Sequence, residues 1–170
     1  MTIFYDSFES PVGRVFAALD GTHAVAVSLT SHDERDFQSE VSSRFAGTPC
    51  RFVRAKIPLI SELREYFDGS RKRFSFSADL SRCTAFQRRV LLKTAKIPYG
   101  QTRTYGWLAR QAGSPGASRA VGQVIARNPV PLIIPCHRVL GSAGELRGFA
   151  GGLKAFDLKR ALLDIEGIRV

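Results

Sequence analysis

The stretch Thr104-Tyr-Gly-Trp-Leu-Ala-Arg-Gln-Ala-Gly-Ser-Pro-Gly-Ala-Ser-Arg-Ala-Val-Gly-Gln-Val-Ile-Ala-Arg127 decides the fold of the second half of this 170-residue chain. Thr104 can cap a short helix that runs to Arg110. Gly113 closes that helix, and a Ser-Pro-Gly turn follows. A second helix is expected over about 117–127. Two helices joined by a tight glycine-bearing turn outline a helix-turn-helix.

The surface of the second helix combines small side chains with arginines. The small residues are Ala117, Ser118, Ala120 and Gly122, and the basic residues are Arg119 and Arg127. Small side chains let a helix backbone lie close to another surface, and arginines contact phosphates or enter a base stack. Ordinary helix packing, with Gly122 as a contact point, explains the same pattern equally well.

Positive charge is concentrated in the same half of the chain. Residues 1–80 carry 10 basic and 11 acidic side chains, whereas residues 81–170 carry 15 basic and four acidic ones. Between Arg82 and Gly144 there are ten basic residues and no acid. Such segregation favours a polyanion as partner over a merely solvated face.

The first half reads as a small scaffold domain of strands and helices. Short β-rich runs cover Ile3–Phe8, Val12–Leu19 and His23–Leu29, with Asp20-Gly21 as a hairpin turn. Ser31-His-Asp-Glu34 is expected to be a capping box for a helix, and a second helix begins near Pro58. Arg73–Ser77 alternates like an edge strand. The charge balance changes sign at about residues 70–81, which are expected to link two domains, 1–80 and 81–170.

The cysteines and histidines do not suggest a disulfide framework or a metal site. Cys50, Cys83 and Cys136 are an odd and sparse set, and neither a Cys-x-x-Cys pair nor a zinc-finger spacing occurs. We therefore expect no metal and no other cofactor. An apolar run long enough to span a bilayer and a secretory signal are also missing, so a cytoplasmic protein without membrane contact is expected.

The segment Asn128-Pro-Val-Pro-Leu-Ile-Ile-Pro-Cys-His-Arg-Val139 is the most informative for chemistry. Its prolines disfavour a regular helix and are expected to hold the chain extended. Cys136 and His137 follow a proline directly, so the thiol is either a nucleophile beside an imidazole or an inert packing residue. In an extended chain the two side chains point to opposite faces, which favours a bridging water over a direct bond. The carboxylates available behind the ring are Glu145, Asp157, Asp164 and Glu166.

Five short motifs together resemble one known family. Pro135-Cys-His-Arg-Val139 resembles the active-site signature of the O6-alkylguanine-DNA alkyltransferases, also called methylated-DNA–protein-cysteine methyltransferases. The other four appear in the family's order: Thr104-Tyr-Gly-Trp-Leu-Ala109, Ser118-Arg-Ala-Val-Gly122, Asn128-Pro129 and Leu162-Leu-Asp-Ile-Glu-Gly167. The resemblance covers residues 84–170 clearly. Residues 1–80 match only as the family's variable amino-terminal domain.

The resemblance implies a fold class and an activity. The fold is expected to be α+β, with a small amino-terminal α/β, ribonuclease-H-like domain before a mostly helical, winged-helix-like domain that carries the helix-turn-helix. The protein would be a methylated-DNA–protein-cysteine S-methyltransferase that repairs DNA. It would move a methyl or other alkyl group from O6-alkylguanine, and also O4-alkylthymine, in duplex DNA to its own cysteine. That transfer would be irreversible, occur once per molecule and follow base flipping.

Catalytic roles carry over residue by residue. Cys136 would accept the alkyl group, His137 would act as a base through a water molecule, and Glu166 would orient the imidazole ring. Tyr105 would donate a hydrogen bond or proton to the departing guanine, and Asn128 would hold the turn that carries the cysteine.

DNA-binding roles fall on the helix-turn-helix and its surroundings. Arg119 would enter the stack where the base leaves, and the second helix would lie in the minor groove. The residues implied to touch DNA are Arg119, Ser118, Ala120, Gly122, Arg127 and Thr104. Those implied to line the base pocket are Val139, Phe149, Ala150 and Gly151, with Phe149 where the family often has tyrosine. The protein is expected to be a monomer in solution that can bind DNA cooperatively.

Two other functions compete with this interpretation. A binding module, either a helix-turn-helix regulator or a relative that grips alkylated bases without transfer, would lack the reactive cysteine that is present here. A thiol hydrolase would need a direct bond between Cys136 and His137, and its neutral substrate would not explain the basic charge. An intact mass after mixing with methylated DNA separates these alternatives.

Overall fold

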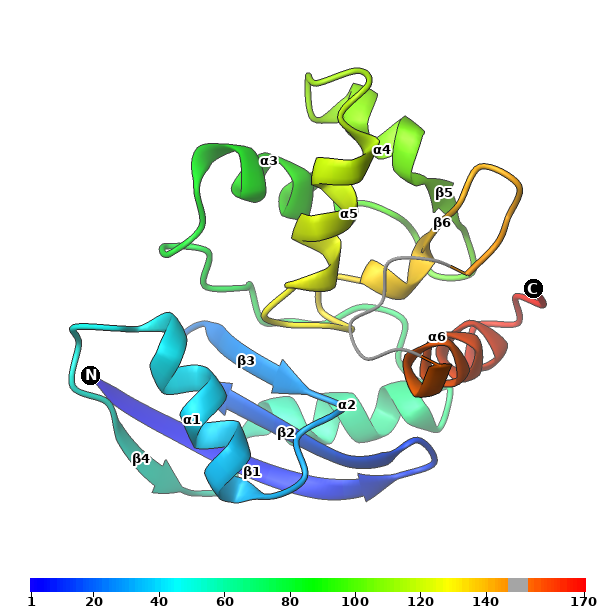
Figure 1. Cartoon of the computed structure of the whole chain (residues 1–170). Coiled ribbons are helices and arrows are strands. Elements are labelled where there is room, and N and C mark those ends of the chain that lie inside the picture. Colours follow the sequence, from blue (N-terminus) through cyan, green and yellow to red (C-terminus); the bar gives the residue numbers. More distant parts are fainter. Residues whose placement is uncertain (147–152) are drawn as a thin grey trace. The chain divides into compact units, whose positions relative to one another are not determined.

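Two units make up the computed structural model, Met1–Arg82 and Cys83–Val170, and the residues described are 1–146 and 153–170 (Figure 1). The first unit combines a sheet with two helices, and the second is mostly helical. The α+β class expected from the sequence is thereby confirmed. Within the described residues, none of the helices is long and apolar enough to cross a membrane.

The first unit is built on a four-stranded sheet in the order β3-β2-β1-β4. Strands β1 (Thr2–Ser10), β2 (Gly13–Leu19) and β3 (Ala24–Ser28) are antiparallel neighbours, and β4 (Arg51–Arg54) runs parallel to β1. The turn expected at Asp20-Gly21 joins β2 to β3. Its glycine has a φ of 113°, and the Asp20 carboxylate accepts hydrogen bonds from the Thr22 and His23 backbone amides.

Helices α1 (Glu34–Arg44) and α2 (Pro58–Phe67) cover opposite faces of this sheet (Figure 1). On one face, Phe37 of α1 stacks on Phe16 of β2 with ring centroids 5.2 Å apart. On the other face, Phe67 of α2 meets Phe8 of β1 edge to face. Alternation of side chains along the strands supplies both faces with apolar residues, so this unit has a core of its own.

Two expectations for the first unit are wrong in detail. The cap of α1 is Asp33 and not Ser31, because the Asp33 carboxylate accepts from the Asp36 amide while the Ser31 hydroxyl is engaged with Ser28 and Glu40. Residues 73–77 do not form a strand. The Ser75 amide donates to the Glu62 carboxylate instead of to a neighbouring strand, and pairing is limited to one bridge between Ala24 and Ala78.

Three helices form the core of the second unit: α3 (Ala85–Thr94), α4 (Tyr105–Gln111) and α5 (Ser118–Ala126). All three contact one another (Figure 1). The capping box expected at Thr84 is present, and Thr104 caps α4 by accepting a hydrogen bond from the Trp107 amide. The turn between α4 and α5 contains Gly113 and Gly116, both with positive φ. Helices α4 and α5 therefore form the predicted helix-turn-helix.

A short parallel ladder connects the helix-turn-helix to the segment that carries Cys136. Strand β5 (Arg103–Thr104) pairs with β6 (Val139–Leu140), with Arg103 opposite Val139. Tyr105 follows β5 directly, and the turn η1 (Cys136–Arg138) precedes β6 directly. Helix α6 (Leu153–Ile165) ends next to Glu166. The two strands thus fix the main chain beside Tyr105 and beside Cys136 against each other.

Candidate active site

Cys136 begins a single turn of 3-10 helix, which differs from the extended chain expected from the sequence. Two backbone hydrogen bonds hold this turn. The Arg138 amide donates to the Pro135 carbonyl at 3.0 Å, and the Cys136 amide donates to the Ile134 carbonyl at 2.8 Å. Successive side chains in such a turn diverge by about 120°. Cys136 is 3% exposed. The thiol is therefore held on a rigid turn and its side chain diverges from that of His137.

Asn128 ties together the loop that precedes this turn. Its Nδ2 donates to the Ile134 carbonyl at 2.7 Å, and its Oδ1 accepts from the Val130 amide at 3.1 Å. Leu132, between them, has a φ of 74°, a conformation that a leucine adopts only when its surroundings impose it. Asn128 thus fixes the loop from both ends, in keeping with the position expected of it.

His137 and Glu166 meet across 29 residues of sequence. Nε2 of His137 lies 2.7 Å from Oε1 of Glu166, and both side chains are fully buried. Burial lowers the pKa of His137, although the Glu166 carboxylate opposes that shift. A neutral imidazole has one N–H, and donating it to the carboxylate leaves Nδ1 as the basic atom of the ring.

Arg138 shares the same carboxylate, a contact that was not predicted from the sequence. Its Nε lies 2.9 Å from Oε2 of Glu166, its Nη2 lies 2.9 Å from Oε1, and its Nη1 donates to the Ile97 carbonyl. The Gly100 amide also donates to Glu166. Burial would raise the pKa of Glu166, but the hydrogen bonds from His137 and Arg138 outweigh it and hold that pKa at about 2. Glu166 therefore stays ionised at neutral pH.

Lys159 is a second residue that the sequence reasoning missed. It is fully buried on α6, where its Nζ donates to the Val139 carbonyl at 2.5 Å and lies 5.7 Å from the centroid of the Tyr105 ring. Burial lowers its pKa to about 8, while the nearby Cys136 acts in the opposite direction. The available signal was its spacing, since Ala155, Lys159 and Leu163 follow one helical face and both neighbours are buried.

The Cys136 thiol is protonated in the resting site. Burial raises its pKa, and the Asn128 side chain and the Lys159 ammonium act against that shift without reversing it. Tyr105 is buried near Cys136. Burial first, and a negative charge on the Cys136 sulfur second, raise the pKa of the Tyr105 hydroxyl, which remains a proton donor at neutral pH. The site thus holds a thiol, a neutral base and a neutral hydroxyl donor.

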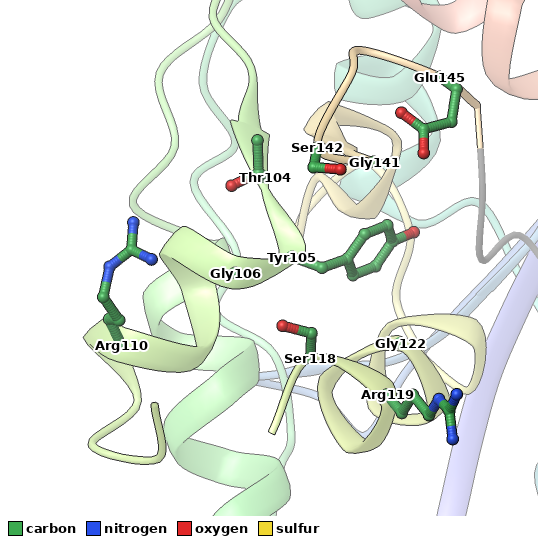
Figure 2. A pocket seen from close by; sticks show the side chains of 10 residues that line it. All are labelled: Thr104, Tyr105, Gly106, Arg110, Ser118, Arg119, Gly122, Gly141, Ser142 and Glu145. Atoms are coloured by element: carbon green, nitrogen blue, oxygen red, sulfur yellow. The ribbon is translucent and has the colours of Figure 1, made fainter. Parts of the chain in front are cut away.

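A cavity of about 470 Å³ opens beside Tyr105 (Figure 2). Five residues expected at the site line it: Thr104, Tyr105, Ser118, Arg119 and Gly122. It is also lined by five residues that the sequence reasoning did not select: Gly106, Arg110, Gly141, Ser142 and Glu145. Figure 2 shows Arg110 and Arg119 well apart, with Ser118 between them.

The remaining residues expected at the site lie elsewhere or outside the described residues. Ala120, on α5, and Arg127, which directly follows α5, are exposed and do not line this cavity. Val139 is fully buried in β6. Phe149, Ala150 and Gly151 lie outside the described residues.

Comparison with known proteins gives consistent results over nearly the whole chain. Residues 85–168 match the family model described as the 6-O-methylguanine DNA methyltransferase, DNA binding domain. The chain is 38% identical to a methylated-DNA–protein-cysteine methyltransferase of Mycobacterium bovis, over 98% of this chain and 94% of that relative. It is 36% identical to the constitutive Bacillus subtilis protein of the same name, over 97% of this chain and 96% of that relative.

Solved structures show the same similarity in three dimensions. The O6-methylguanine methyltransferase of Mycobacterium tuberculosis superposes with a TM-score of 0.81 at 33% identity, covering 99% of this chain and 94% of that one. The crystal structure of Mycobacterium tuberculosis OGT in complex with DNA superposes with a TM-score of 0.78 at 35% identity, covering 96% of this chain and 92% of that one.

Proposed function

The chain belongs to the methylated-DNA–protein-cysteine methyltransferase family, and on that premise we propose that Cys136 is the residue that accepts the alkyl group. Membership makes the chain a DNA-binding repair protein with methylated-DNA–protein-cysteine methyltransferase activity. The observation that carries the assignment to Cys136 is its place on the same turn as His137 and Arg138, both of which are hydrogen-bonded to Glu166.

The reaction begins with loss of the thiol proton. Because burial raises the pKa of Cys136, a base is needed, and Nδ1 of the neutral His137 is the basic atom of the ring. A water molecule relays the proton between side chains that diverge on the turn. The Glu166 carboxylate, ionised because its pKa is about 2, stabilises the imidazolium that results.

Transfer then exchanges one bond for another. The Cys136 sulfur attacks the alkyl carbon of O6-alkylguanine, a carbon–sulfur bond forms, and the bond between that carbon and O6 breaks. The electron pair of the broken bond passes to guanine, where the Tyr105 hydroxyl donates a hydrogen bond that stabilises the developing charge. The departing guanine takes up the proton that left the thiol, by way of solvent, so atoms and charge balance.

The lesion reaches the sulfur by leaving the duplex. A base inside a double helix is inaccessible, so the nucleotide is extruded at a cost of a few kcal/mol. Arg119 is exposed on α5 and lines the cavity beside Tyr105, a position suited to filling the space left by the extruded base. Arg119 and the small Ala120 are exposed on α5, and the exposed Arg127 directly follows the helix, which suits close approach to a minor groove.

The same arrangement favours a single transfer per molecule. A thioether is stable, and no second cysteine lies near Cys136 in the sequence to remove the alkyl group, because the other two are Cys50 and Cys83. The substrates are O6-alkylguanine and, by the same chemistry at an exocyclic oxygen, O4-alkylthymine.

Intact mass spectrometry tests the proposal directly. The protein is incubated with a duplex containing O6-methylguanine, and a gain equal to one CH₂ per molecule is expected, mapped to Cys136 by peptide analysis. Cys136→Ala should bind the same duplex and gain no mass. An unchanged mass with tight binding would instead support the binding module, and an adduct on Cys50 or Cys83 would overturn the assignment.

A further inference from the structure

Several arginines of the chain are already ion-paired. In the first unit Arg14, Arg44, Arg54 and Arg71 each face a carboxylate, and in the second unit Arg138 is bound to Glu166. The Arg110 side chain is exposed, and within residues 1–146 and 153–170 its guanidinium makes neither an ion pair nor a hydrogen bond. Its guanidinium is therefore available to an anion from outside the protein.

Arg110 belongs to a cluster of donors that converges over one glycine. A Cβ built on Gly106 would lie 3.8 Å from Nη1 of Arg110, 3.8 Å from Oγ of Ser118 and 3.9 Å from Oγ1 of Thr104. Arg110 reaches this point because residues four apart lie on one face of a helix. Ser118 comes from the start of α5 and Thr104 from the end of β5, so three separate elements contribute to the cluster.

The missing side chain at position 106 leaves the middle of the cluster open. All four residues line the cavity that also contains Tyr105 and Arg119 (Figure 2). Arg110 and Arg119 are well apart in that view, with Ser118 between them. An anion at Gly106 would thus lie in the same cavity as Arg119, which we assign to the vacated base position, but away from Arg119.

We infer that Arg110, Ser118 and Thr104 form, over Gly106, a seat for one backbone phosphate of the bound DNA strand. A guanidinium pairs with two phosphate oxygens at once, and hydroxyl groups supply further contacts that hold the backbone in register. The inference rests on the proposed function, since it names a DNA phosphate as the anion. Arg110 takes no part in the transfer step.

The test measures how steeply DNA affinity falls with salt, because each phosphate that the protein contacts releases bound counterions. The affinity for a duplex is measured by fluorescence anisotropy from about 0.05 to about 0.5 M NaCl, which is about one decade, for the wild type, Arg110→Gln and Arg160→Gln. Loss of one phosphate contact lowers the slope of log K against log salt by about 0.9 and weakens binding roughly tenfold. Arg160 is exposed on α6 and does not line the cavity, so its variant removes the same charge elsewhere.

Chemical removal of single phosphate charges locates the contact. A series of duplexes with one neutral methylphosphonate each should contain one position that weakens the wild type and the Arg160→Gln variant but leaves Arg110→Gln unaffected. Gly106→Ala should also weaken binding, because its Cβ fits at ordinary contact distances yet occupies the seat. Equal losses of slope for Arg110→Gln and Arg160→Gln, or a methylphosphonate series without such a position, would overturn the inference.

The transfer assay separates this inference from the proposed function. A wild type that binds DNA with the expected salt response but gains no mass would refute the proposed function and leave the phosphate seat standing.

Discussion

Glu166→Gln tests the claim that one buried carboxylate supports both the base and the stability of the second unit. Glutamine keeps the size of the side chain and removes its charge. The pKa of Glu166 falls from 4.5 to about 2 in the folded protein, and at 1.36 kcal/mol for each pH unit this corresponds to about 3 kcal/mol of stability at pH 7. Arg138 would also be left buried without its counter-charge, a loss of about 3 to 5 kcal/mol in known cases.

Urea unfolding followed by tryptophan fluorescence measures this loss. Trp107, in α4, is the only tryptophan of the chain and reports on the second unit. At pH 7 the variant should be less stable than the wild type by about 3 to 5 kcal/mol. Because the folded-state pKa lies below the unfolded one, the Glu166 contribution is complete above about pH 4.5 and is lost as the pH falls towards 2. The gap between wild type and variant should therefore narrow with acid.

A double variant separates the loss of the Glu166 charge from the effect of leaving Arg138 buried without a partner. Replacing both partners, in Glu166→Gln with Arg138→Met, removes the unpaired cation and should recover at least half of the lost stability. Unchanged stability of Glu166→Gln at pH 7, or a gap that stays constant between pH 5 and pH 3, would refute the reasoning about this carboxylate.

Four further changes probe the site. Tyr105→Phe should slow methyl transfer by roughly 10- to 100-fold in a quenched single-turnover assay with duplex affinity unchanged, and a wild-type rate would remove its role as donor. Arg119→Ala should reduce the second-order rate with duplex lesions much more than the rate with free O6-methylguanine, and equal losses would contradict base-flipping assistance. Asn128→Ala should lower the free energy of unfolding by about 1 to 3 kcal/mol in urea titrations, because the hydrogen bonds to Ile134 and Val130 are lost. An unchanged free energy of unfolding would show that the loop does not depend on these two hydrogen bonds. Lys159→Met should slow transfer at pH 7, because the Lys159 ammonium acts to lower the pKa of Cys136. It should not lower stability, because burial lowers the pKa of Lys159 to about 8 and the folded protein carries a buried charge at a cost below that pH. In the wild type this penalty is relieved as the pH rises through 8, so the stability advantage of the variant should shrink there.

Local signals in the sequence predicted local structure well. The caps at Thr84 and Thr104 and the hairpin at Asp20-Gly21 depend on hydrogen bonds within a few residues, so the sequence alone contains the information. The α1 cap was placed two residues early because Asp33 and Ser31 are both competent, and the contacts of Ser31 with Ser28 and Glu40 decide between them. The strand predicted over residues 73–77 was wrong for a related reason. The Ser75 amide donates to Glu62, which is distant in sequence, and not to a neighbouring strand.

Contacts between distant segments were beyond sequence reasoning. Arg138 was counted with the basic surface, and only the fold shows that Glu166 neutralises it. Lys159 was not selected from the sequence, and only the fold places its Nζ beside the Val139 carbonyl. The partnership of His137 with Glu166 came from the resemblance to a family, because four carboxylates were otherwise available. Burial of a charged side chain depends on partners that the linear order does not reveal.

The two-residue ladder of β5 and β6 has a consequence for how this protein can diverge. Its main-chain pairing aligns the backbone just before Tyr105 with the backbone just after the turn that carries Cys136. Backbone pairing does not depend on most side-chain identities, so Arg103 and Leu140 can change while the pairing persists, whereas Thr104 also caps α4 and Val139 is buried. Insertion of a single residue on either side would slide that alignment by about 3.3 Å, and length in this region should therefore be far less tolerant than composition.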